Sequence, residues 1–497
     1  MLEPYLRSAR RRVSNPAHLI RSVFQLSIAQ GLTWIGGAAL AILLPRFLGD
    51  VNLGKYTFAF AITTLIGLGA DLGLATYLTR EVARDNKAAS RITTAVLLIR
   101  VPLSLLAGAI AIVSAYLLGY DELTRSVLYV LSLNILVVSV SGVVFGALQG
   151  LHRMKVLAVT NVLNKLGYAG LAAALLFGGA GPFELAMGYL TVGVLTLAIG
   201  TVVMLKRIKL TLNLDRRLYW TLLVGGAPFF VWQAALLVYG QIDMVLLSFL
   251  TSDAVIGWYA AAYRIVMIPV FVPTIIVTVI FPALSAAREA LEFNMLARRA
   301  VHAAGIVTIP MALGIMLLPD KIIQLLGYPE TFSHSSLPLM LLAPHLPVAA
   351  IDVMIGCVLN TRDKQRHWAL TGVAAAALNP LLNVVAIPIT QQMFGNGAIG
   401  AAAITTVTEL FMMAVGLRLL PAGVLNRATL IDLLRMLGAG LAMAGVVFLT
   451  RELPIVVPIV LGALVYLGSC LLLRAVSLGE LNQVRLHLVQ RQASAIG

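Results

Sequence analysis

The sequence has little charge and little cysteine, and each shortage excludes a class of protein. Only 11% of its 497 residues are charged, while 60% are apolar and the mean hydropathy is +0.94. An ordinary soluble protein is about 25% charged. The polar residues are therefore too few to cover soluble cores of this total length in water. The two cysteines, Cys357 and Cys470, lie in separate apolar runs, which excludes a disulfide framework and a metal-ligand spacing.

Long apolar runs fill most of the chain, divided by short charged or turn-rich breaks. A membrane-spanning helix needs about 20 predominantly apolar residues. The stretch after Arg10-Arg11-Arg12 is longer than the core of a signal peptide and lacks a small-residue cleavage site, so we interpret it as the first span. We expect an all-α membrane protein with fourteen spans, at 22–45, 55–79, 92–118, 124–150, 156–178, 183–205, 220–250, 255–284, 299–318, 335–360, 367–390, 396–420, 433–451 and 454–475.

The net charge of +15 raises nucleic acid as a partner. Most Lys and Arg residues, however, fall in alternate loops, and the opposite loops hold only Arg46, Lys55, Arg125, Lys321 and Arg451. This asymmetry follows the positive-inside rule and predicts that both termini are cytoplasmic. We therefore expect no nucleic-acid partner. The loops are also too short for the extramembrane catalytic residues of a membrane glycosyltransferase, which argues against an enzyme.

Two similar turns suggest an internal repeat. Gly54-Lys55-Tyr56 follows the first span, and Gly257-Trp258-Tyr259 follows the seventh, each after a Phe-Leu pair. An offset of six spans, an even number, gives two lobes that enter the membrane in the same direction, as in parallel-repeat transporters. We expect two six-helix lobes and a C-terminal helix pair. The predicted segments are a cytoplasmic segment 1–21, an N-lobe 22–210, a C-lobe 211–425, a terminal helix pair 426–476 and a cytoplasmic tail 477–497.

Three stretches of the sequence resemble one transporter family. They read LPRFLGDVNLGKYTFAFA, ADLGLATYLTREVARD and QIDMVLLSFLTSDAVIGWYAAAYRIVMIPVFVPTIIVTVIFPALS. With the expected span number, they are similar to the polysaccharide-exporter branch of the multidrug/oligosaccharidyl-lipid/polysaccharide (MOP) flippase superfamily. The resemblance covers essentially the whole chain. It implies transport of undecaprenyl-pyrophosphate-linked sugars from the cytoplasmic to the outer leaflet, without nucleotide hydrolysis by the protein itself.

Ionisable side chains inside the expected spans are the candidate functional residues, because a charge in the bilayer is costly and usually faces a cavity or a partner. Asp71 and Arg100 lie at matching depths on two neighbouring spans, and so do Asp243 and Arg264. Each pair is predicted either to form a buried ion pair or to line a substrate cavity. The resemblance favours a cavity position for Arg264, although relatives often carry Asp where this chain has Tyr263.

Four further residues complete the candidate set. Lys165 has no acid at its depth on the neighbouring span, so it either faces the cavity or reaches toward the interface. Arg46, at the outer end of the first span, either receives the head group or anchors the helix. Asp352 and Glu409 either bind a coupling ion or hydrogen-bond nearby hydroxyl side chains. The candidate pyrophosphate ligands are thus Arg264, Lys165, Arg100 and Arg46, and the candidate coupling or ion-pair acids are Asp71, Asp243, Asp352 and Glu409.

The expected function is alternating-access transport of a polyprenyl-pyrophosphate-linked oligosaccharide across the cytoplasmic membrane, for cell-surface polysaccharide biosynthesis. We expect no metal site and no cofactor, with H⁺ or Na⁺ as the candidate coupling ion. The expected partners are the lipid-linked substrate, membrane lipids, a polysaccharide polymerase and glycosyltransferases. A drug or metabolite antiporter of the same superfamily and a flippase of the peptidoglycan lipid precursor are the alternatives.

Overall fold

The computed structural model describes residues 16–211, 215–287, 289–424 and 426–475, with side chains from residue 31 onward except residue 32. Helix makes up 88% of the structure, and the described residues form no strand. The predicted all-α fold is therefore confirmed. The predicted tail 477–497, and most of the predicted segment 1–21, lie outside the described residues.

The chain forms two compact units, which are described one at a time. Unit 1 comprises residues 1–48 and 55–241, and unit 2 comprises residues 49–54 and 242–497. The division therefore falls inside a helix, after Gln241, and does not by itself test the predicted lobe boundaries at 210 and 425. Those boundaries, and the parallel arrangement of the lobes, stay predictions.

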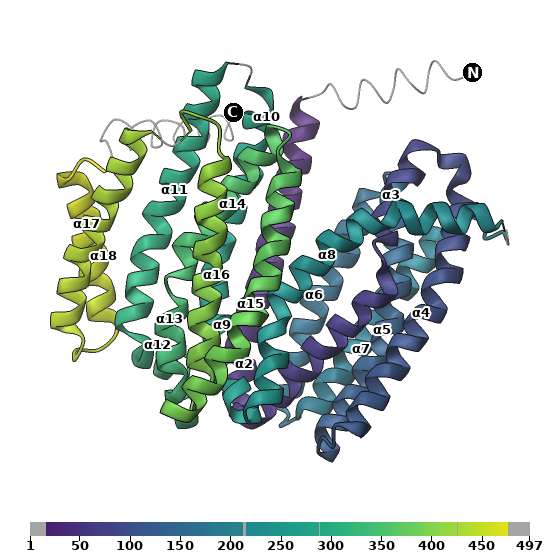
Figure 1. Cartoon of the computed structure of the whole chain (residues 1–497), viewed down its shortest axis with the longest axis horizontal. Coiled ribbons are helices and arrows are strands. Elements are labelled where there is room, and N and C mark those ends of the chain that lie inside the picture. The colour runs from purple at the N-terminus through teal and green to yellow at the C-terminus, as the bar shows by residue number, and fades with distance from the viewer. Residues whose placement is uncertain (1–15, 212–214, 288, 425, 476–497) are drawn as a thin grey trace, which may run out of the picture. The chain divides into compact units, whose positions relative to one another are not determined.

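Unit 1 is a bundle of long helices (Figure 1). The first, α2 (Pro16–Asp71), belongs to unit 1 except for residues 49–54, and it bends at Gly49, whose φ of 73° is accessible to glycine at little cost. The chain turns again at Leu72 and Gly73, both with positive φ, so that α3 starts in a new direction. The remaining helices of the unit are α3 (Leu74–Arg84), α4 (Ala89–Leu117), α5 (Glu122–Gly150), α6 (Met154–Phe177), α7 (Pro182–Leu205) and most of α8 (Arg216–Leu250).

The core of unit 1 forms around α3. Its apolar face, with Leu74 and Leu78, packs against Val143 of α5 and Leu222 of α8, all of them buried. Close packing of α3 on α5 requires glycine, because a Cβ on Gly150 would lie 2.7 Å from the Val82 side chain. These contacts fix the ends of α2, α4, α5 and α8 relative to one another, which positions the side chains of the site described below.

Unit 2 contains the helices that follow α8. In Figure 1, α17 and α18 lie side by side next to α11, and their shared core contains Met436, Met443 and Tyr466. A second core joins α10, α11 and α14 through Leu284, Phe293 and Val358. The helices are α9 (Asp253–Met267), α10 (Phe271–Ala286), α11 (Ala290–Leu317), α12 (Pro319–Leu325), α13 (Ser336–Leu342), α14 (His345–Thr361), α15 (Gln365–Phe394), α16 (Ala398–Leu419), α17 (Arg427–Thr450) and α18 (Val456–Leu472).

Ten of the described helices are long and apolar enough to cross a membrane, or eleven if the bent pair ending at Thr361 is one span. The predicted spans 22–45 and 55–79 both begin within α2, on either side of Gly49. The predicted spans 156–178 and 454–475 coincide with α6 and with the shorter apolar helix α18. The protein is thus a multi-span membrane protein, and the number fourteen stays a prediction.

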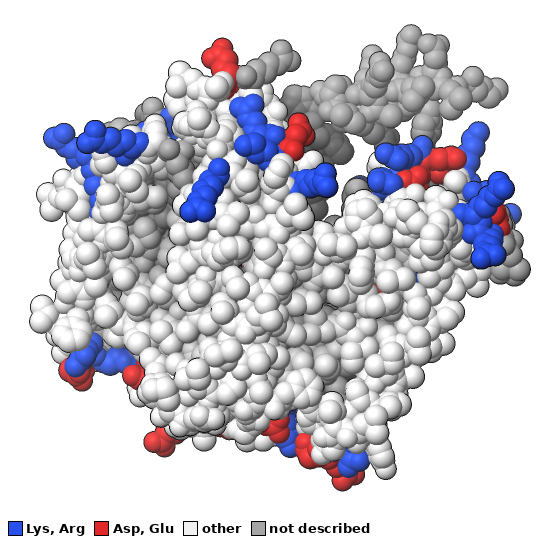
Figure 2. All heavy atoms as spheres, in the orientation of Figure 1, with Lys and Arg blue, Asp and Glu red and all other residues white. Residues whose placement is uncertain are grey.

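Charged side chains are distributed as a bilayer requires. Figure 2 shows Lys, Arg, Asp and Glu gathered at the ends of each unit, with a largely uncharged band of surface between them. Large apolar side chains such as Leu106, Val279 and Leu449 are more than half exposed in the apolar helices of this band. Lipid tails solvate such side chains, so their exposure is the expected state for helices that face the bilayer.

Candidate functional site

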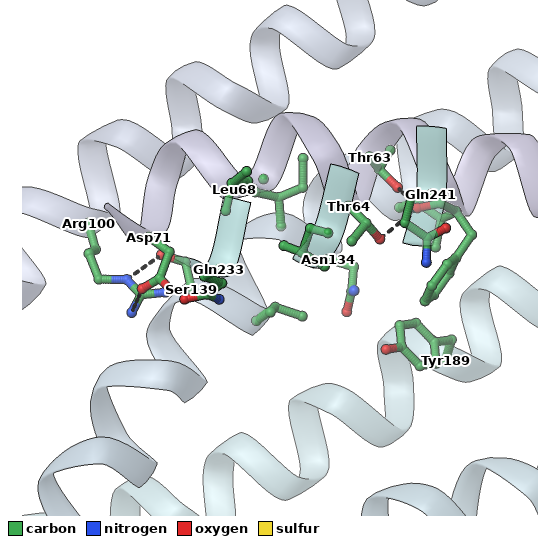
Figure 3. A pocket seen from close by; sticks show the side chains of 16 residues that line it. Thr63, Thr64, Leu68, Asp71, Arg100, Asn134, Ser139, Tyr189, Gln233 and Gln241 are labelled. Carbon is green, nitrogen blue, oxygen red and sulfur yellow. Dashed lines mark hydrogen bonds and ion pairs between the residues drawn. The ribbon is translucent and has the colours of Figure 1, made fainter. Parts of the chain in front are cut away.

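Unit 1 contains a polar cavity of about 420 Å³ between its helices. It is bounded by α2, α4, α5, α7 and α8, and Figure 3 shows the side chains that point into it. Its polar lining combines one ion pair with uncharged amides and hydroxyls. The polar residues are Thr63, Thr64, Asp71, Arg100, Asn134, Ser139, Tyr189, Gln233 and Gln241.

The ion pair lies at one end of the cavity. Arg100 Nη1 is 2.6 Å from Asp71 Oδ1, and Arg100 Nε donates to Ser139 Oγ at 3.2 Å. The guanidinium packs against Gly142, where a Cβ would lie 3.0 Å from Nη1. The predicted Asp71–Arg100 ion pair is confirmed. Because the carboxylate neutralises the guanidinium, the pair brings donors and acceptors to the cavity without net charge.

The other end of the cavity is formed by uncharged side chains. Figure 3 places Gln241, Thr64 and Tyr189 there, with Asn134 between the two ends. The Thr64 hydroxyl donates to the Phe60 carbonyl at 2.7 Å, which leaves its lone pairs available to a ligand. The Tyr189 ring meets the Phe60 ring edge to face, with centroids 5.5 Å apart, so the cavity also presents aromatic surface.

Sequence reasoning missed the uncharged part of this site. It selected residues by charge, and amides or hydroxyls in a span stand out less than an isolated Asp or Arg. The helical period does carry a signal: Gln233 and Gln241 are eight residues apart on α8, and Thr63, Gly67 and Asp71 recur every four residues on α2. Such spacing puts each set on one face of its helix.

The four predicted pyrophosphate ligands do not gather in this cavity, since only Arg100 lines it. Lys165 on α6 is exposed, and Arg46 on α2 is exposed with its guanidinium 5.9 Å from the centre of the Phe47 ring. Arg264 on α9 is half-buried near Tyr328. Burial raises the pKa of Tyr328, and the positive charge of Arg264 opposes that rise.

Unit 2 holds the predicted acid Asp243, which is 6% exposed. Its carboxylate accepts hydrogen bonds from the Tyr259 hydroxyl at 2.6 Å, the Thr405 hydroxyl at 2.8 Å and the Asn383 amide at 2.8 Å. The predicted ion pair with Arg264 is not confirmed, because neutral donors occupy both carboxylate oxygens. These donors come from α9, which follows α8 directly, and from α15 and α16, which lie far along the chain.

The remaining two predicted acids meet in unit 2. Asp352 on α14 and Glu409 on α16 are 4% and 6% exposed, and their carboxylates lie close enough to interact. His345 Nδ1, at the start of α14, is 3.8 Å from Glu409 Oε2. The prediction that each acid hydrogen-bonds hydroxyl neighbours is not confirmed for Asp352, whose oxygens have no hydrogen-bond partner among the described residues.

Two sequence comparisons find similar proteins. A family model described as polysaccharide biosynthesis protein matches residues 19–287. The probable flippase AglR of Haloferax volcanii is 30% identical over 191 residues, which cover 37% of this chain and 39% of that relative. The matched part is therefore well under half of the curated relative's length.

The fold is shared with solved transporters. A lipid II flippase MurJ, in an inward closed conformation, has a TM-score of 0.73 at 19% identity and covers 89% of this chain and 97% of its own. An inward-facing multidrug resistance MATE transporter of the MOP superfamily has a TM-score of 0.56 at 16% identity, over 80% of this chain and 94% of its own. At such identities the likeness concerns the fold alone.

Proposed function

The chain belongs to the polysaccharide biosynthesis protein family, as the resemblance of its sequence predicted, and from this premise we propose that it is a flippase for a polyprenyl-pyrophosphate-linked oligosaccharide. The observation that carries the proposal is the cavity of unit 1, which holds uncharged hydrogen-bonding side chains inside an apolar helical protein. The saccharide enters this cavity while the polyprenyl tail stays in the bilayer. Alternating access of the cavity to the two membrane faces then moves the sugar across.

The lining of the cavity is chemically suited to sugar hydroxyls. Each hydroxyl both donates and accepts a hydrogen bond, and the amides of Asn134, Gln233 and Gln241 offer both functions without charge. The Phe60 and Tyr189 rings offer apolar surface to the C–H faces of a sugar ring. Uncharged polar side chains also cost less to bury than isolated charges.

We assign the pyrophosphate to cationic side chains other than Arg100, because Asp71 already neutralises that residue. Lys165 and Arg46 are exposed on helices of unit 1, and Arg264 is half-buried in unit 2. Arginine suits phosphate oxygens because its planar donors bind two of them at once. A gradient of H⁺ or Na⁺ supplies the energy, and the ion binds at a buried acidic side chain.

The proposal extends to the setting of the protein in the cell. Its termini lie in the cytoplasm, where the basic loops attract the anionic lipid-linked substrate. Glycosyltransferases that build the lipid-linked oligosaccharide supply the substrate, and a polysaccharide polymerase on the other face consumes it. These enzymes are the proposed partners in the membrane.

A liposome flipping assay tests the role of the cavity. The Gln233→Leu/Gln241→Leu variant leaves sugar hydroxyls unpaired in the cavity, and each unpaired buried group costs about 1–3 kcal/mol. We expect about a tenfold or greater loss of oligosaccharide flipping by the purified variant. The matched control is Gln392→Leu, which replaces an exposed glutamine of α15 and should retain the wild-type rate.

Three outcomes would contradict this proposal. An unchanged flipping rate in the double variant would show that the saccharide does not bind in the cavity. Preferential flipping of the peptidoglycan lipid precursor would assign the protein to that substrate instead. Export of a cationic dye without any flipping of lipid-linked saccharide would make it an antiporter of small molecules.

A further inference from the structure

A cluster of arginines joins α11, α17 and α18 in unit 2 and takes no part in the proposed saccharide cavity. The Asp432 carboxylate on α17 accepts a hydrogen bond from Arg298 of α11, and its other oxygen lies 3.4 Å from Arg435 Nη1. The same Arg435 nitrogen is 3.5 Å from the backbone carbonyl oxygen of Arg474, which follows α18. We call Arg298, Arg435 and Arg474 the arginine cluster. Asp432 thus brings two guanidiniums from neighbouring helices to one carboxylate.

The end of α18 is fixed, which gives the third arginine a defined position. Arg474 has a φ of 55°, in the left-handed region that non-glycine residues seldom adopt. This conformation lets Ala475 N donate to the Cys470 carbonyl at 2.8 Å, a bond that closes the last turn of the helix. The Ala475 carbonyl oxygen in turn lies 2.6 Å from His302 Nε2 on α11. The backbone of Arg474 is therefore held beside both neighbouring helices.

The arginine cluster carries more positive charge and more donors than its internal contacts use. Its three arginines and the one aspartate between them leave two net positive charges. Each guanidinium has five N–H donors, whereas Asp432 offers one oxygen to Arg298 and one to Arg435. The side chains of Arg298 and Arg435 are 36% and 40% exposed, and Arg474 is exposed as well. The surplus donors therefore face the surface, where Figure 2 shows blue side chains over the ends of α17 and α18 at the upper left.

The depth of the cluster matches the head-group layer of a membrane. Arg435 of α17 and Arg451 at the C-terminal end of this helix stand 16 positions apart, or about 24 Å at the α-helical rise. The hydrocarbon core of a bilayer is about 30 Å thick, so the two arginines fall near its opposite surfaces. Next to Arg435, Leu434, Leu437 and Leu441 repeat on one face of α17 and are 57%, 45% and 62% exposed. The cluster therefore adjoins a surface that lipid tails cover.

We propose that the arginine cluster binds the phosphate of an anionic phospholipid from the surrounding bilayer, with Asp432 as the residue that positions the guanidiniums. A planar guanidinium binds two phosphate oxygens at once, and basic sites between membrane helices attract anionic head groups. Arginines that only anchored a helix end would reach into water, and they would need no shared carboxylate. A lipid bound here bridges α11, α17 and α18 and holds the terminal pair against α11. This inference concerns the membrane around the protein and does not rest on the proposed function.

Native mass spectrometry of the full-length protein in detergent tests the site with two phospholipids of equal chain length. We expect dioleoylphosphatidylglycerol, which is anionic, to bind at least about tenfold more tightly than zwitterionic dioleoylphosphatidylcholine. Arg435→Gln/Arg474→Gln removes two of the three cationic ligands and should lose most of this preference. The matched control Arg451→Gln replaces an exposed arginine at the other end of α17 and should keep the preference.

A change at Asp432 separates an aligned site from attraction by charge alone. Asp432→Asn adds one positive charge to the cluster, so charge alone predicts tighter binding of phosphatidylglycerol. The aligned site predicts several-fold weaker binding, because an amide no longer holds both guanidiniums in place, and tighter binding would overturn the proposal. Equal affinity of the wild type for the two phospholipids would also overturn it, and this comparison decides even if a variant fails to fold. So would tighter binding of polyprenyl pyrophosphate that Arg435→Gln/Arg474→Gln abolishes, since it would assign the arginines to the transported lipid.

Discussion

At the scale of single residues, the intramembrane charges show both what the sequence predicts and where it fails. Asp71 and Arg100 form the predicted ion pair. This pair could be predicted because the depth of a residue in two antiparallel helices follows from its residue number alone. Depth alone was insufficient to predict the partners of Asp243, since these are neutral side chains from α9, α15 and α16. Which helix faces meet depends on packing that span positions do not specify.

The buried ion pair supports a prediction about stability. Arg100→Leu leaves the Asp71 carboxylate buried without its partner, and breaking a buried pair in this way costs about 3–5 kcal/mol. The Asp71→Asn/Arg100→Leu double variant removes both charges and should recover a large part of that loss. Chemical unfolding in detergent measures the free energies of unfolding.

A matched control separates burial from charge. Glu452→Ala breaks the exposed pair with Arg451, which should change the free energy of unfolding by less than about 1 kcal/mol. Equal losses in Arg100→Leu and Glu452→Ala would show that burial of the Asp71–Arg100 pair contributes nothing to stability.

At the scale of elements, the repeated turn motif has a structural reason. In unit 2, a Cβ on Gly54 would lie 1.8 Å from the Asp253 carbonyl oxygen, and a Cβ on Gly257 would lie 2.0 Å from the Asp50 carbonyl oxygen. The two copies of the motif therefore pack against each other, backbone to backbone. Trp258 Nε1 adds a hydrogen bond to Asp50 Oδ2 at 3.0 Å. The sequence shows the repeat but not that its two copies touch.

Because of this contact, we expect that adding a methyl group at Gly257 destabilises the protein. Gly257→Ala should destabilise the protein by about 1–3 kcal/mol, the usual cost of overpacking, because backbone atoms cannot move aside as a side chain can. Gly468→Ala, where no heavy atom lies within 4 Å of the added methyl, should be neutral or slightly stabilising. Thermal unfolding in detergent compares the two, and equal midpoints would contradict the close contact.

Helix positions followed from the sequence better than helix shape did. Apolar length and charged breaks predict nearly every helix, since a bilayer demands both. They did not predict that α2 continues through the first turn with a bend at Gly49. They did predict one span at 255–284, which the structure forms from α9, a short turn at Pro269 and α10. Local backbone geometry at a Gly or Pro depends on what packs beside it.

At the scale of the whole molecule, family membership was predictable from sequence, whereas the composition of the candidate site was not. The resemblance pointed to the polysaccharide biosynthesis family, to which the chain belongs. The prediction of cationic ligands, however, left out the amides and hydroxyls that make up most of the cavity lining. Uncharged polar residues become a recognisable site only when several helices bring them to one cavity, as in Figure 3.

We propose that the protein recognises the saccharide of its substrate through the uncharged amides and hydroxyls of the cavity in unit 1. The most direct measurement is the flipping rate of wild-type protein in liposomes, for a lipid-linked oligosaccharide and for the same polyprenyl pyrophosphate without its saccharide. We expect the saccharide-bearing lipid to cross at least about tenfold faster, because only the sugar makes the hydrogen bonds of the cavity. Equal rates for the two lipids would contradict it.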